Sequence, residues 1–101
     1  MTAMVQARYR EHGETALRWL DELPDKNNAQ ERMQIAAIIQ QLVAMRDDLI
    51  ERRRAGEACG DALRRTNAIL SSLFGTEFPL NELQLKRVCE TRDALREMLK
   101  A

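Results

Sequence analysis

Aromatic residues are scarce in this sequence: one Trp, one Tyr and two Phe make up 4% of the chain. β-Branched residues are also few, so the residue types that favour strands are under-represented. The hydrophobic core must therefore be aliphatic, built from Leu, Ile, Val, Met and Ala. This composition favours interlocked helices over a sheet.

Cysteine and histidine are too few for the usual metal or redox sites. Cys59 and Cys89 are thirty residues apart, so no CxxC motif exists for a zinc ribbon or a thioredoxin-type site. His12 is the sole histidine, whereas a zinc-protease helix needs two, four residues apart. We expect no metal and no cofactor, and we expect His12 to lie at the surface or edge of a helix. Two cysteines also fall short of the disulfide framework of a small secreted domain.

Net charge and long apolar runs are absent as well. Sixteen basic and sixteen acidic residues cancel, so nothing attracts nucleic acid or an anionic membrane over a distance. Little repulsion opposes self-association either. The longest charge-free run, Met33–Met45, has 13 residues, and a membrane span needs about 20. Arg8 and Arg10 interrupt any signal-peptide core, so we expect a cytoplasmic protein.

The spacing of apolar residues is typical of helices along most of the chain. It predicts four helices at about 3–23, 29–54, 60–74 and 81–100. Short connections favour antiparallel neighbours. The sequence therefore predicts an all-α protein, a small antiparallel four-helix bundle forming one domain over 1–101. Three helices would result if the third merged with its neighbours.

Five residues are expected to mark bends and helix ends. Gly13 indicates either a bend in the first helix or the close approach of a neighbour. Pro24 should end that helix, because the residue before proline avoids the α region. Asn28 and Asn81 resemble N-caps, each with Glu or Gln three residues later. Gly75 is expected just after the third helix.

The long central helix, from Gln30 to Arg54, carries the most informative pattern. One apolar stripe repeats at intervals of three and four, and a second lies beside it. Together they form a face wider than one packing seam requires. This helix should contact two or more elements of its own chain, or another copy. The first stripe is Ile35, Ile38, Leu42, Met45 and Leu49, and the second is Ala36, Ile39, Val43 and Ile50.

The sequence contains few candidate catalytic residues. Cys59 lies between two glycines near a helix start, where a thiolate would be stabilised, and it is the best candidate nucleophile for an enzyme. Asp47, Asp48 and Glu51 form an acidic patch, but arginines alternate with them at helical spacing, so charge pairing explains them better. We expect a protein that is not an enzyme.

Two kinds of binding remain. A protein interface would use three residues of the second stripe and three of the four aromatics, namely Trp19, Ile39, Val43, Ile50, Phe74 and Phe78. A nucleic-acid interface would use Arg52, Arg53, Arg54, Arg64 and Arg65. Acidic residues are interspersed with these arginines, and no base-stacking aromatics accompany them. The sequence favours a protein-binding module, a small regulator, inhibitor or chaperone acting by helix–helix docking, and we expect a homodimer.

The segment Thr66–Gly75 is similar to the C-terminal helix of TraM-type quorum-sensing antiactivators, which are small helical dimers. The similarity covers ten residues, and a whole further helix follows them here, unlike in that family. No site residue is carried over. The chain is short, charge-balanced and rich in arginine. In these respects it also resembles bacterial secretion chaperones and regulators encoded by phages or plasmids.

Overall fold

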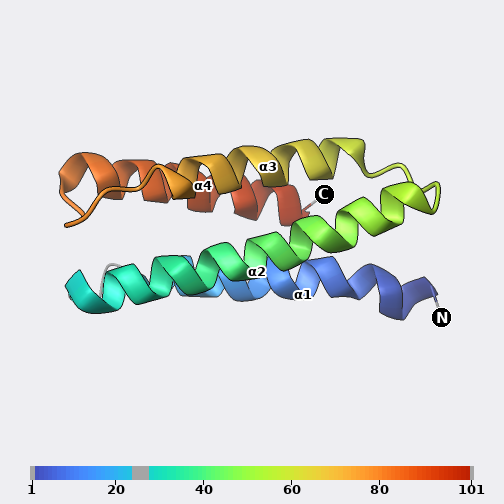
Figure 1. Cartoon of the computed structure of the whole chain (residues 1–101), viewed down its shortest axis with the longest axis horizontal. Helices are drawn as coiled ribbons and strands as arrows, with labels where there is room; N and C mark the ends of the chain where they lie inside the picture. The colour runs from blue at the N-terminus through green and yellow to red at the C-terminus, as the bar shows by residue number, and fades with distance from the viewer. Residues whose placement is uncertain (1, 24–27, 101) are drawn as a thin grey trace.

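The computed structural model of the chain describes residues 2–23 and 28–100, with side chains from residue 8 to 23 and from 29 to 100. It contains four helices: α1 Thr2–Glu22, α2 Asn28–Arg54, α3 Gly60–Phe74 and α4 Glu82–Lys100 (Figure 1). The predicted all-α bundle of four helices is confirmed, and each helix boundary falls within one residue of its prediction.

The four helices form an elongated antiparallel bundle of 42 × 20 × 19 Å. Each helix packs mainly against two others, in the cyclic order α1, α2, α3, α4. Figure 1 shows α1 and α2 as one layer and α3 and α4 as the other. The end of α2 and the start of α3 lie at one end of the bundle. The end of α3 and the start of α4 lie at the other.

The core follows the first apolar stripe of α2. All five predicted stripe residues are buried, and three of them have no exposed surface: Ile38, Leu42 and Met45. The second stripe is divided. Ala36 is exposed, whereas Ile39, Val43 and Ile50 are half-buried and pack on the core. The neighbouring helices of the same chain therefore cover much of the wide face of α2.

Gly13 lies where α1 meets α2 and α4. A Cβ atom built on Gly13 would lie 2.9 Å from Cδ2 of Leu99 on α4 and 3.3 Å from Sδ of Met45 on α2. The helix continues through this position without interruption. Of the two expectations for this glycine, the structure shows the close approach.

The ends of α2 and α3 are built differently. Gly56 adopts φ +96°, and the amide of Glu57 donates to the Arg52 carbonyl at 3.0 Å, so α2 ends in a Schellman motif. Gly75 follows α3 as predicted, but its φ of −84° is not left-handed. Pro24 lies outside the described residues, as does the side chain of Asn28, so the two predictions on them are left as predictions.

The start of α4 is capped by Asn81. Its Oδ1 accepts a hydrogen bond from the amide of Gln84 at 2.9 Å, which confirms the predicted N-cap. The second half of the capping box is not formed. The buried side chain of Gln84 turns instead to accept a hydrogen bond from the Glu77 amide at 3.2 Å. This bond ties the α3–α4 linker to the first turn of α4.

Candidate functional site

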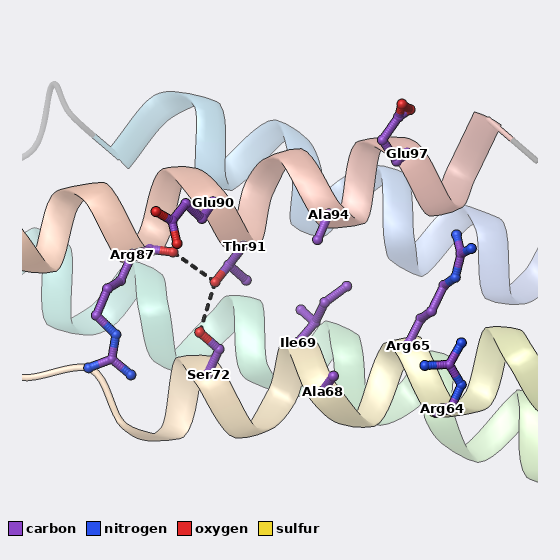
Figure 2. A pocket seen from close by; sticks show the side chains of 10 residues that line it. All are labelled: Arg64, Arg65, Ala68, Ile69, Ser72, Arg87, Glu90, Thr91, Ala94 and Glu97. Carbon is purple, nitrogen blue, oxygen red and sulfur yellow. Dashed lines mark hydrogen bonds between the residues drawn. The ribbon is translucent and has the colours of Figure 1, made fainter.

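An open groove of about 430 Å³ runs along the outer face of the bundle between α3 and α4 (Figure 2). Both of its walls are helical, and they come from consecutive helices joined by a short linker. Apart from Ile69, the lining residues are small or charged: Arg64, Arg65, Ala68, Ile69 and Ser72 from α3, and Arg87, Glu90, Thr91, Ala94 and Glu97 from α4.

The floor of the groove consists of small side chains. Ala68 and Ala94 are exposed on facing edges of the two helices, and the buried Ile69 lies beneath them. Ser72 and Thr91 join the helices through a hydrogen bond of 2.9 Å between their hydroxyl oxygens. Short side chains leave space where larger ones would fill the gap between two packed helices. The groove is therefore a consequence of which residue types lie on these two edges.

Charge gathers at the end of the groove where α3 begins. Arg64 and Arg65 both form ion pairs with Asp61, the latter at 3.0 Å. The hydrogen bond from Arg64, together with the charges of Arg65 and Arg64, holds the pKa of Asp61 below its usual value. One carboxylate balances only one of the two guanidinium groups. Glu97, on the α4 side of this end, lies 3.7 Å from Lys100.

Arg87 marks the other end of the groove. Its side chain crosses from α4 toward the end of α3, where Nη2 lies 3.6 Å from the position of a Cβ on Gly75 (Figure 2). The last carbonyl groups of a helix carry partial negative charge, which favours a cation there. Within the described part of the chain, Arg87 forms no ion pair with a carboxylate. The α3–α4 groove is thus bounded by arginine at both ends, with Glu90 and Glu97 along its α4 edge.

None of the six residues predicted for a protein interface lines the α3–α4 groove. Trp19 is half-buried against the core, like the three aliphatic residues of α2. Phe78 is half-buried, with the guanidinium of Arg32 lying 4.9 Å from the centre of its ring. Phe74 alone is strongly exposed, at 65%. The structure therefore distributes these residues over α1, α2, α3 and the α3–α4 linker and does not gather them into one groove.

The five arginines predicted for nucleic-acid binding are not equivalent. Arg52 is 5% exposed and donates through Nε to Asp48 at 2.9 Å, so it is an interior residue. Its guanidinium also lies 3.4 Å from Glu57 and 5.1 Å from the centre of the Tyr9 ring. The other four arginines are exposed, two of them on the α3–α4 groove.

Of the remaining candidates, Cys59 and His12 have hydrogen-bond partners. The Cys59 thiol is half-buried and donates to the Leu49 carbonyl oxygen, with Sγ 3.2 Å from O. His12 is half-buried, and its Nδ1 lies 2.7 Å from Oε1 of Gln41. Cys89 is half-buried on α4. In the part of the chain that the structure describes, no group of three or more His, Cys, Asp or Glu side chains is arranged to hold a metal ion.

The α3–α4 groove was missed from the sequence. Its floor is made of small residues, which neither interrupt an apolar stripe nor form a stripe of their own. A periodic pattern identifies the buried face of each helix, but it does not show which outer edges meet. The sequence contained one signal of the groove. Ala68 and Ala94 are small residues, and each directly precedes a residue on the buried face of its helix, Ile69 on α3 and Leu95 on α4.

Comparisons with models of known protein families, with curated proteins and with solved structures found no match to this chain. Among the described helices, none is long and apolar enough to cross a membrane. The function is therefore inferred from the residues of the chain itself.

Proposed function

We propose that this chain is a non-enzymatic protein-binding module that acts by docking a helix into the α3–α4 groove. It would serve as a small cytoplasmic regulator, inhibitor or chaperone of the kind that bacteria, phages and plasmids encode. One observation carries the proposal: an open groove with a small-residue floor lies between two well-packed helices. The scarcity of candidate catalytic residues in the sequence supports the proposal.

The residues that line the groove suit the docking of a helix. Packed helices lie 8–10 Å apart, and the lower distance requires small residues at the contact. Ala68 and Ala94 supply such residues at the middle of the groove, and the charged groups stay at its edges. This arrangement matches the usual anatomy of an interface, with an apolar centre and a polar rim.

Blocking the groove tests the proposal. Ala94→Arg places a long side chain on the floor of the groove. Ala36→Arg makes the same change on the exposed face of α2 and serves as the matched control. Tagged wild-type protein and both variants would be recovered from cells that express the chain naturally, and the co-purifying proteins quantified by mass spectrometry. Circular dichroism would confirm equal helicity.

We expect a set of proteins to co-purify with the wild type and with Ala36→Arg, and to be depleted at least tenfold with Ala94→Arg. The same set in equal amounts with all three proteins would contradict the proposal, because the groove would then play no part in binding.

A further inference from the structure

We propose that a second copy of this chain covers the α3–α4 groove, related to the first by a two-fold axis that runs parallel to the helices. The inference rests on the proposed use of the groove as a docking surface and names the helices that cover it. In this arrangement α4 of each copy lies over α3 of the other. Charge complementarity between the two edges of the groove carries the inference.

The register of α3 and α4 sets the height of each charge along the groove. Ser72 and Thr91 are side by side, as their hydrogen bond shows. The helices are antiparallel, so residues before Ser72 lie beside residues after Thr91. One turn along, Ala68 comes level with Ala94, and two turns along, Arg64 and Arg65 come level with Glu97. Figure 2 shows the three charged residues at the same end of the groove.

A two-fold axis along the groove leaves these heights unchanged and exchanges the edges. The α4 edge of one copy then faces the α3 edge of the other, and Glu97 faces Arg64 and Arg65 across the interface. Symmetry forms this contact twice. Asp61 balances only one of the two arginines within the chain, so positive charge remains on the α3 edge. The partner of Glu97 in its own chain is Lys100, at 3.7 Å. That pair is 67% exposed on both sides and therefore weak, so Glu97 is available to the arginines of the second copy. The floors meet at the same time, because Ala68 of each copy opposes Ala94 of the other.

The alternative two-fold axis, perpendicular to the helices, is disfavoured by the same charges. It would lay α3 over α3 in reverse and bring Arg64 and Arg65 of one copy toward the Arg87 end of the other. Like charges opposite each other weaken an interface. Only the parallel axis turns the basic α3 edge and the acidic Glu97 into partners.

The expected dimer is weak and sensitive to salt. α3 has 15 residues and is about 22 Å long, so the contact area lies at the low end for stable interfaces. The charge pairs lie at the rim, where salt screens them. We expect association in the micromolar range at low salt, and at least a tenfold weakening at 0.5 M NaCl.

A charge-reversal experiment tests the arrangement by sedimentation velocity. The variants are Glu97→Arg and the double variant Arg64→Glu/Arg65→Glu, all at exposed positions. Each variant alone places like charges together at both contacts, so we expect each to be at least tenfold weaker than wild type. A mixture of the two restores opposite charges at both contacts. We expect that mixture to form heterodimers with near wild-type affinity.

Cysteine cross-linking distinguishes the two axes. In a Cys59→Ser/Cys89→Ser background, the parallel axis predicts disulfides between an Ala68→Cys chain and an Ala94→Cys chain when the two are mixed, since a disulfide needs Cα atoms about 4.4–6.8 Å apart. Disulfides that link each single variant to itself would indicate the perpendicular axis and overturn the arrangement.

Failure of this inference and failure of the proposed function give different results. A wild-type chain that stays monomeric at 200 µM (roughly a hundredfold above the micromolar affinity expected from its small interface) refutes the dimer. If Ala94→Arg still abolishes co-purification in that case, the docking function stands with a different occupant. If Ala94→Arg changes neither dimerisation nor co-purification, both proposals are refuted.

Discussion

Arg52 and Asp48 form an ion pair inside the bundle, one turn apart on α2, with Nε 2.9 Å from Oδ2. Arg52 is 5% exposed and Asp48 is 8% exposed. Glu57, from the α2–α3 connection, approaches the same guanidinium at 3.4 Å, and the Tyr9 ring of α1 lies against it. Three segments of the chain therefore converge on one buried arginine.

Removing one member of this pair leaves the other charge buried without its partner. We expect Arg52→Ala to lower the free energy of unfolding by about 3–5 kcal/mol. Urea denaturation followed by circular dichroism would measure the loss. Arg53→Ala is the matched control, because Arg53 is exposed, and its effect should stay within about 0.5 kcal/mol.

The double variant Asp48→Leu/Arg52→Leu tests the physical reason. Replacing both charges by apolar groups removes the desolvation cost along with the attraction, so we expect it to be more stable than Arg52→Ala. If Arg52→Ala were no more harmful than Arg53→Ala, the buried pair would contribute nothing to stability.

For Arg52, the helical spacing of the sequence predicts burial, whereas the residue type predicts exposure. The apolar stripe of α2 has regular intervals of three and four residues up to Leu49. Arg52, three residues further on, continues that spacing. Helical geometry alone placed this arginine on the buried face. Its charge and the two arginines after it indicated a surface cluster instead. Helix number, boundaries and the main stripe were predictable because they depend on local pattern and capping.

The α3–α4 groove was not predictable in this way. It depends on how the outer edges of two helices meet, which is set by packing across the whole bundle. Ala68 and Ala94 contribute little to any apolar period, and the Ser72–Thr91 hydrogen bond requires the register of the two helices. Small residues on an outer edge reveal a groove only after the neighbouring helix is known.

Gly13 is expected to be required for the packing of α1 against α4. Gly13→Val places methyl groups where Leu99 and Met45 already lie, so we expect a loss of about 1–3 kcal/mol from overpacking. Gly60→Val is the control, because nothing lies within 4 Å of a Cβ at that position. Urea denaturation compares the two variants. Equal stabilities would contradict the close approach at Gly13.

Asn81 is expected to stabilise the start of α4 as its N-cap. Asn81→Ala removes the acceptor for the Gln84 amide, and we expect a loss of about 1 kcal/mol. Asn67→Ala is the control, since Asn67 is exposed within α3 and alanine favours a helix. Thermal unfolding should show a lower Tm for the first variant only. An unchanged Tm for Asn81→Ala would mean that water replaces the cap without cost.

Cys59 is expected to be an ordinary thiol. It is half-buried, and its hydrogen is donated to the Leu49 carbonyl. In a Cys89→Ser variant, we expect iodoacetamide to modify Cys59 no faster than free cysteine at the same pH. Labelling followed by mass spectrometry would measure the rate, with urea-unfolded protein as the reference for full access. A rate well above that of free cysteine would revive the enzyme hypothesis, with Cys59 as nucleophile.

Nucleic-acid binding is expected to be absent, and the exposed arginines allow a direct test. Non-specific binding depends on several cations that contact phosphates together, and it strengthens steeply as salt is lowered. Here Arg64 and Arg65 share Asp61, and Arg52 is buried. We expect no change in the fluorescence anisotropy of a labelled random duplex or single strand at 50 mM NaCl, the low end of the salt range over which such binding is usually compared. Binding that weakens with salt and is lost in Arg53→Ala or Arg64→Ala would instead support a nucleic-acid regulator, because only phosphate contacts give that combination.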